Sequence, residues 1–135
     1  MQPKNTKYKK YYKPRYYSSR LNVLNNLKPY SRYSIIALES SYINGKQIEA
    51  ARQSIRRKLK RRGILRILVF PDIAVSKKST SSRMGKGKGK IDRWTTKINP
   101  GKILFELIGV SDKDSINALK CGSNKLPLKL KICHQ

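Results

Sequence analysis

The stretch of sequence that decides the fold is NGKQIEAARQSIRRKLKRRG, residues 44–63. Asn44 is a favoured N-cap residue, and Gln47 three positions later completes a capping-box pattern. Gly63 stands where a C′ glycine would end a helix. At about 100° per residue, one face carries only apolar side chains, those of Ile48, Ala51, Ile55 and Leu59. The stretch therefore predicts an amphipathic helix that packs on a core.

The rest of this helix is crowded with positive charge. Glu49 is its only acid, so few i,i+4 ion pairs can form, and like charges at this density destabilise an isolated helix. An ordinary solvated face would contain more glutamates, whereas binding to phosphates would neutralise the charge. We expect the phosphate-binding side chains to be Arg52, Arg56, Arg57, Lys60 and Arg61.

Strands are predicted on both sides of the helix. Residues 33–38 and 64–70 are apolar and β-rich, and Pro71-Asp72 ends the second run. Residues 91–98 and 102–110 flank Asn99-Pro100-Gly101, which is typical of a hairpin turn. Trp94 and Phe105 are the large rings of these two strands, and we expect core packing before base stacking for both.

The end of the chain predicts a second helix and a last strand. Ser111 and Asp114 repeat the capping-box pattern for a helix that bears Ile116 and Leu119 and ends near Gly122. After it, leucines and isoleucine alternate with lysines over residues 125–132, which favours a half-buried strand. The predicted fold class is α+β, with two helices packed on a mostly antiparallel sheet. Residues 35–135 would form this single domain, with an extended loop at 72–90, and residues 1–34 an arm.

The composition indicates an anionic partner. The 135 residues fit one domain, and 32 Lys and Arg against seven acids give a net charge of +25. Nucleic acid is the default partner for such a chain, and an anionic membrane surface is the competitor. We expect no membrane-spanning segment, since the longest apolar run is residues 67–70.

The arm combines positive charge with tyrosines. Its first 20 residues contain no acid, and the tyrosines are Tyr8, Tyr11, Tyr12, Tyr16 and Tyr17. Such a segment cannot offset its ordering entropy by burial, so we expect it to be disordered without its partner. Cations with interleaved rings suit RNA, although a solubilising tail is the alternative. The expected RNA-binding cations are Lys4, Lys7, Lys9, Lys10, Lys13 and Arg15.

A glycine-lysine stretch, Arg83-Met84-Gly85-Lys86-Gly87-Lys88-Gly89, ends the long loop. It has little to bury, and its glycines allow positive φ and a close backbone approach to an anionic surface. It lacks the Ser or Thr of a nucleoside-triphosphate loop, and its G-x-G-x-G spacing is not the dinucleotide fingerprint. A solvated, disordered loop is the alternative interpretation.

The sequence carries only weak signals for metal binding or catalysis. Cys121, Cys133 and His134 do not make a paired metal motif; two half-buried thiols in a reducing compartment are favoured over a zinc site. We predict no cofactor and no catalytic set, and hence no enzyme. Two rival functions are a free nucleic-acid chaperone or DNA-compacting protein, and an enzyme that uses the glycine loop on a phosphate substrate.

Several motifs in order resemble the large-subunit ribosomal protein L-sixteen family of bacteria and organelles. They are Gln2-Pro3-Lys4, Gln47-Ile48-Glu49-Ala50-Ala51-Arg52, Val69-Phe70-Pro71-Asp72, the loop from Arg83 to Gly89, Pro100-Gly101-Lys102-Ile103-Leu104-Phe105-Glu106 and Lys125-Leu126-Pro127. The resemblance implies a structural constituent of the large subunit that binds its rRNA below the central protuberance. It also implies that residues 83–89 point towards tRNA near the aminoacyl site and the peptidyl-transferase centre.

The implied partners are large-subunit rRNA, tRNA and neighbouring ribosomal proteins, without self-association. The arm departs from the family after Lys13, where a Gly- and Arg-rich segment is usual, and the segment between Asp114 and Lys125 is also diverged. The chain begins at the family's own start, and its substitutions favour Lys, Asn, Ile and Tyr, as an AT-rich genome would. We expect an organelle-encoded protein of the mitochondrial ribosome, with a plastid or an AT-rich bacterium as the alternative.

Overall fold

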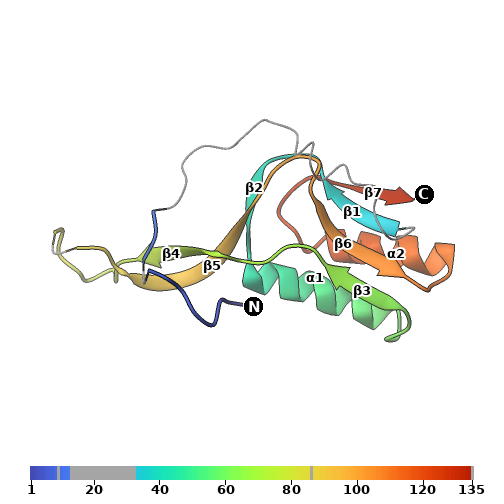
Figure 1. Ribbon diagram of the computed structural model, residues 1–135, viewed down its shortest axis with the longest axis horizontal. Coiled ribbons are helices and arrows are strands. Elements are labelled where there is room, and N and C mark those ends of the chain that lie inside the picture. Colours follow the sequence, from blue (N-terminus) through green and yellow to red (C-terminus); the bar gives the residue numbers. More distant parts are fainter. Residues whose placement is uncertain (9, 13–32, 86, 135) are drawn as a thin grey trace.

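The computed structural model describes residues 1–8, 10–12, 33–85 and 87–134. Seven strands and two helices lie within these ranges (Figure 1). In chain order they are β1 (Tyr33–Ala37), β2 (Ser41–Asn44), α1 (Gly45–Lys58), β3 (Ile64–Ile67), β4 (Ile73–Lys77), β5 (Lys90–Ile98), β6 (Ile103–Ile108), α2 (Asp112–Ser123) and β7 (Leu130–His134). The predicted α+β class is confirmed.

The described strands form two antiparallel sheets, where a single sheet was expected. One has the order β3-β6-β1-β7, and the other β2-β5-β4. Residues of the four-stranded sheet, including Ile35, Phe105 and Leu107, and the apolar faces of both helices share one core, which Ile43 of β2 and Ile98 of β5 also join. Figure 1 shows β4 and β5 leaving this core as a long ribbon. The core therefore occupies one end of the molecule.

Helix α1 begins as its sequence predicts. The backbone N–H of Asn44 donates to Oε1 of Gln47 at 2.9 Å, which is half of the capping box. The four residues of the predicted apolar stripe, from Ile48 to Leu59, are essentially inaccessible to water. Strand β2 runs directly into this helix, so α1 joins the two sheets.

The predicted end of α1 at Gly63 is wrong. The N–H of Lys60 donates to the carbonyl of Arg57 at 3.2 Å, and the N–H of Arg61 donates to that of Arg56 at 3.1 Å. This is a Schellman motif, with Lys60 at C′ and φ of +50°. Gly63 lies beyond the helix, where φ is +71° and an added Cβ would lie 2.3 Å from Cγ2 of Val110. Its role is close packing against the end of β6.

The second helix confirms most of its prediction. α2 starts after Ser111, whose hydroxyl donates to Asp114 at 3.0 Å, and Leu119 is fully buried. Ile116 is 39% exposed and does not enter the core. Gly122 lies inside α2 against α1: an added Cβ would be 2.4 Å from Cγ1 of Ile55. The helices can approach this closely because position 122 has no side chain.

The predicted hairpin around residues 99–101 is wrong. β5 pairs with β2 and β4, whereas β6 pairs with β1 and β3. The connecting turn is bonded to β1: the N–H of Gly101 donates to the carbonyl of Ala37 at 2.8 Å, and Ala37 donates to Lys102 at 3.0 Å. The chain therefore changes sheets at this turn instead of folding back on itself.

Residues 72–90 are not one long loop. Ile73–Lys77 forms strand β4, which pairs with β5 from Ile73 opposite Thr95 to Lys77 opposite Lys90. β2 was also absent from the prediction. The last strand begins only at Leu130, although the alternation starts at residue 125. Phe105 is fully buried as expected, while Trp94 on β5 is half-buried.

Candidate nucleic-acid interface

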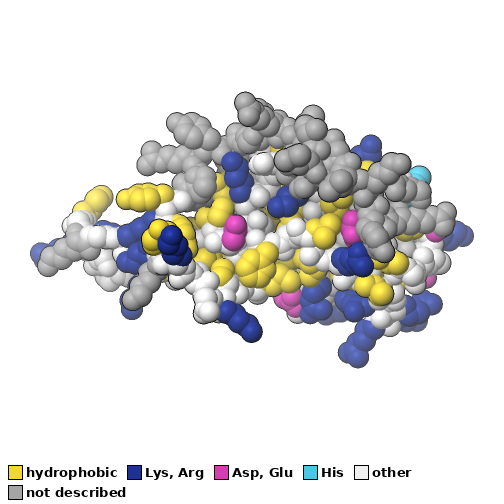
Figure 2. All heavy atoms as spheres, viewed as in Figure 1, with side chains coloured by type: hydrophobic (Ala, Val, Ile, Leu, Met, Phe, Trp, Pro, Cys, Tyr) yellow, Lys and Arg dark blue, Asp and Glu magenta, His cyan; other side chains and the backbone are white. Residues whose placement is uncertain are grey.

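The C-terminal half of α1 presents a cationic surface. Its side chains border a surface hollow, and the lining residues are Arg52, Gln53, Arg56, Arg57, Lys60 and Arg61. Figure 2 shows Lys and Arg side chains gathered over this end of the helix. All five cations predicted from the helical sequence are therefore neighbours. These cations nevertheless differ in the hydrogen bonds and ion pairs that they already make within the protein.

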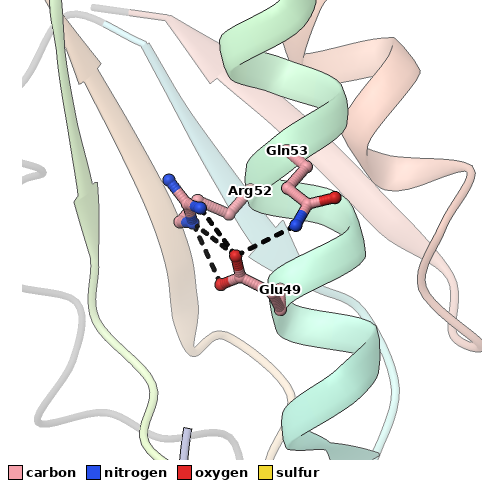
Figure 3. A network of polar contacts seen from close by, with 3 residues as sticks. All are labelled: Glu49, Arg52 and Gln53. Atoms are coloured by element: carbon pink, nitrogen blue, oxygen red, sulfur yellow. Dashed lines mark hydrogen bonds and ion pairs between the residues drawn. The ribbon is translucent and has the colours of Figure 1, made fainter.

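Arg52 is paired within the helix. Its guanidinium binds the Glu49 carboxylate through two nitrogens, with Nη2 at 2.6 Å from Oε1 and Nε at 3.0 Å from Oε2. Nε2 of Gln53 also donates to Oε1 at 3.3 Å, so three side chains meet at this carboxylate (Figure 3). The hydrogen bond from Arg52 lowers the pKa of Glu49, and the same bond raises the pKa of Arg52. A phosphate would have to compete with Glu49 for this arginine.

Arg56 holds the chain that follows the helix. Its Nη1 donates to the carbonyl of Gly63 at 2.9 Å and to that of Arg61 at 3.3 Å. These bonds fix the segment in which Lys60 and Arg61 both have positive φ. An L residue at positive φ is strained, so the bonds from Arg56 offset part of that cost. We assign Arg56 a positioning role first.

Three cations of this surface are available to an anion. Within the described residues, Arg57, Lys60 and Arg61 make no ion pair with an acid, and all three are exposed. They come from the last turn of α1 and from the Schellman motif that ends it. The partial negative charge of a helix C-terminus favours cations at this place. The turn thus concentrates positive charge without a matching acid.

The glycine-lysine loop lies at the far end of the β4–β5 ribbon (Figure 1). The loop residues border a second surface hollow, together with the ends of β4 and β5. Gly85 and Gly87 have φ of +98° and +83°, a Cβ added at either would meet nothing within 4 Å, and Met84 is fully exposed. Nζ of Lys78 donates to the carbonyl of Gly85 at 2.6 Å and holds the turn. Positive charge and exposed backbone therefore occur together here.

Gly89 closes the loop at its neck. A Cβ at this position would lie 2.3 Å from the carbonyl oxygen of Lys77 and 2.7 Å from the backbone N of Lys78. The two chains of the ribbon can meet there only because residue 89 has no side chain. Of the three glycines, this one is required by crowding and the other two by their backbone conformation.

The arm contacts the loop. Nζ of Lys10 donates to the carbonyl of Lys88 at 2.6 Å, and Nζ of Lys88 donates to the carbonyl of Tyr11. The same ammonium lies 4.5 Å from the ring centre of Tyr12. Lys4 and Lys7 are exposed elsewhere on the arm. The predicted binding residues Lys9, Lys13, Arg15 and Lys86, and the tyrosines Tyr16 and Tyr17, lie outside the described residues.

The cysteines lie on different elements. Cys121 belongs to α2 and Cys133 to β7, both as free, half-buried thiols, and the His134 ring packs edge-on to Tyr33 at 6.4 Å between centres. No group of three metal-binding side chains occurs among the residues that the structure describes. Over the same ranges, no helix is long and apolar enough to cross a membrane.

Three features of these surfaces were missed by the sequence analysis. The Glu49–Arg52 pair had a signal in its i,i+3 spacing, which can join oppositely charged side chains on a helix. The sequence carries no such signal for the bonds from Arg56 to backbone carbonyls, or for the contact between the arm and Lys88. The first depends on the backbone beyond the helix, and the second joins residues 78 positions apart.

The chain has a net charge of +25, and its folded α+β part presents a cationic turn and a cationic glycine loop, which is the pattern of a basic protein suited to an anionic polymer. Comparison with known families is more specific. The chain belongs to the family described as "Ribosomal protein L16p/L10e", which matches residues 3–133. It is therefore a ribosomal protein with a structural role.

Bacterial relatives match almost end to end. The chain is 42% identical over 132 residues to "Large ribosomal subunit protein uL16" of Paracoccus denitrificans, which covers 98% of this chain and 95% of the relative. The protein of the same name from Cereibacter sphaeroides gives the same identity and coverage. That of Caulobacter vibrioides is 39% identical, covering 98% of this chain and 91% of the relative. The resemblance predicted from the motifs is confirmed.

Proposed function

We propose that this protein is built into the large ribosomal subunit, where it binds rRNA below the central protuberance and helps to position tRNA. The arm and the C-terminal surface of α1 hold rRNA. Residues 83–89 reach towards tRNA near the aminoacyl site and the peptidyl-transferase centre. The protein catalyses no reaction itself, and it acts as a single copy among neighbouring ribosomal proteins. Family membership and the two cationic surfaces support this proposal.

The observation that carries the proposal is the separation of the two surfaces. Figure 1 places the loop at one end of the long axis and the C-terminal end of α1 towards the other. A single small ligand would need one concave site, whereas two distant cationic surfaces suit a long, folded polyanion. The core and the β4–β5 ribbon that leaves it set their spacing (Figure 1).

The α1 surface binds backbone phosphates in this proposal. Arg57, Lys60 and Arg61 make the direct contacts, because no described acid competes for them. Arg52 contributes less while Glu49 holds it, and Arg56 acts by fixing the turn. Phosphate contacts of this kind provide affinity and orientation without reading sequence, so binding should depend steeply on salt.

The loop acts through both charge and backbone. The space that a Cβ would occupy at Gly85 and Gly87 is open, and Arg83 and Lys88 provide charge on either side. A glycine backbone can lie against a nucleic-acid surface more closely than one that carries side chains. The loop therefore suits a place where RNA and tRNA surfaces meet.

Replacing Arg83, Lys86 and Lys88 together by alanine tests the role of the loop. We expect an unchanged circular dichroism spectrum and melting temperature, because Arg83 and Lys88 lie outside the core cluster, and impaired translation by ribosomes that carry the variant. A matched control removes the same charge elsewhere, through alanine at Lys113, Lys120 and Lys125, which are exposed on or near α2. Equal translation with both variants would contradict a role for the loop. Loss of the fold in the loop variant would also contradict it.

The compartment is part of the proposal. The bias towards Lys, Asn, Ile and Tyr supports an organelle-encoded protein of the mitochondrial ribosome, with a plastid as the alternative. Because the relatives are bacterial, the cytoplasm of an AT-rich bacterium is a further alternative. Gradient sedimentation of a mitochondrial lysate, with and without ribonuclease, tests both the compartment and the assembly into the ribosome. We expect sedimentation with the large subunit and a shift after ribonuclease. A light or DNA-bound fraction would favour a free nucleic-acid chaperone instead.

A further inference from the structure

Tyr12 is an aromatic ring that the fold leaves in water. It is 94% exposed, whereas most large rings of the described chain are at least partly covered. Its neighbour Tyr11 is half-buried and meets the ring of Tyr8 edge-on, with centres 6.1 Å apart. The short arm segment is therefore partly packed, but Tyr12 projects from it. A projecting ring gains nothing from burial in the free protein.

Lys88 ties this ring to the loop. Its ammonium lies 4.5 Å from the ring centre of Tyr12 and also donates to the carbonyl of Tyr11. Lys10 returns a bond to the carbonyl of Lys88 at 2.6 Å. In Figure 1 the N-terminal segment crosses the β4–β5 ribbon near the loop, in agreement with these contacts. Lys88 thus contacts the ring, and the bonds from Lys10 and Lys88 join the arm and the loop beside it, while most of the ring surface stays open.

We propose that Tyr12, Lys88 and Lys10 form a binding site for one unpaired nucleotide of RNA. The base stacks on the open surface of the Tyr12 ring, and the ammonium groups of Lys10 and Lys88 provide charge for the phosphates beside it. This inference rests on the proposed function and specifies one site within it. It also makes the arm and the loop parts of the same site.

The chemistry favours an unpaired nucleotide over a duplex. Stacking on an exposed ring needs a base whose face is free, and bases inside a helix stack on one another. A ring flanked by lysines is the arrangement found where proteins bind single strands, because the ring takes the base and the cations take the backbone. A cation against a tyrosine ring also restrains its rotation, so less freedom is lost on binding.

The test is RNA binding by the full chain with single replacements. The probe is a short single-stranded RNA without stable structure that carries 2-aminopurine, whose fluorescence is quenched by stacking. We expect the natural chain to quench the probe when it binds. Tyr12→Ala should weaken binding about 5- to 100-fold and abolish the quenching that binding adds to that of the free RNA. The dependence on salt should not change, since no charge is removed. Tyr12→Phe should bind as the natural protein does.

Two further variants make the result specific. Lys88→Gln should weaken binding and lower the salt slope by about one phosphate contact, because it removes a charge and releases the ring. Phe70→Ala removes another exposed ring, 51% accessible and outside the arm and the loop, and should leave binding and quenching unchanged. Binding to an RNA duplex should not respond to Tyr12→Ala.

Each outcome decides a different point. If Tyr12→Ala binds as tightly as the natural chain while Lys88→Gln and the α1 variants still weaken binding, the stacking site is wrong and RNA binding stands. If Tyr12→Ala weakens duplex and single strand equally, the site does not select an unpaired nucleotide and the inference is also wrong. If the natural chain binds no RNA at all, the proposed function itself fails.

Discussion

Replacing Gly89 by alanine should open the neck of the β4–β5 ribbon and leave the core unchanged. The new methyl group would lie 2.3 Å from the carbonyl oxygen of Lys77, and this distance has to grow to at least 3.0 Å. The opposing atoms are backbone, so no side chain can rotate away. The two strands must therefore separate where Lys77 faces Lys90, the last pair of the ladder.

The cost should stay local. Forcing one extra carbon into a packed site costs about 1–3 kcal/mol. This energy would be spent in breaking the end of the ladder, since neither Lys77 nor Lys90 belongs to the core cluster. Local opening free energies are separable from global stability. The melting temperature should therefore change little, while the ribbon opens more often by a factor of about 5 to 150.

Hydrogen–deuterium exchange read by mass spectrometry measures this opening. Peptides that cover β4 and the first half of β5 should exchange faster in Gly89→Ala, and peptides from α1 should not. Gly85→Ala and Gly87→Ala are matched controls, because the added carbon has nothing within 4 Å at either position. Their positive φ strains the loop tip without pressing on the neck. Unchanged exchange in β4 for Gly89→Ala would refute the steric reasoning.

Three further changes test the core and the helix. Ile55→Asp should unfold the domain, since it places a charge on a fully buried stripe at about 3–5 kcal/mol, and an unchanged melting temperature would count against the packing of α1. Gly122→Ala should destabilise by about 1 kcal/mol, and by up to about 2 kcal/mol, in denaturant unfolding, because overpacking against Ile55 exceeds the helix-propensity gain of about 1 kcal/mol. Asn117→Ala on the exposed side of the same helix should be neutral or slightly stabilising. Equal changes in the free energy of unfolding for the two variants would contradict the overpacking at Gly122. Glu49→Gln should cost about 0.5 kcal/mol or less near neutral pH. The lowered pKa of Glu49 means that Arg52 stabilises the fold while the carboxylate is charged, so this difference should shrink as the pH falls through the ordinary pKa of a glutamate and vanish below the lowered pKa of Glu49; a difference that persists in strong acid would contradict it.

The helices could be predicted because their signals are local. Asn44 and Gln47 lie in the same turn as the N–H groups that they cap, and the apolar stripe needs only the helical period. The end of α1 was misplaced for a related reason. Glycine is favoured at C′, but the sequence did not reveal that bonds from Arg56 would hold Lys60 in that conformation.

The division into two sheets could not be predicted from local patterns. Asn99-Pro100-Gly101 has the composition of a hairpin turn and closes on Lys102, yet Gly101 and Lys102 bond to Ala37, which is more than 60 positions away in the sequence. β4 was hidden by a similar effect. Its apolar run, Ile73 to Val75, is only three residues long and continues directly into a Ser- and Lys-rich loop, so pairing with β5 is what makes it a strand.

The candidate site divides in the same way. Charge alone predicted the helix surface and the loop as candidates, because clusters of cations with few acids are visible in the sequence. What each cation does depends on its neighbours in space: Arg52 is paired with Glu49, Arg56 binds carbonyls, and Lys88 meets the arm. None of these distinctions follows from residue type.

The position of β1 has a consequence for how the protein is made. β1 lies between β6 and β7 in the four-stranded sheet, and Tyr33 faces His134 across the last pair. One edge of β1 therefore stays unpaired until residues 130–134 have been synthesised and have left the exit tunnel. The basic arm emerges about a hundred residues earlier. During that interval the nascent chain exposes its cations before the domain can close, so an anionic partner or a chaperone has access to the arm while the sheet is still incomplete.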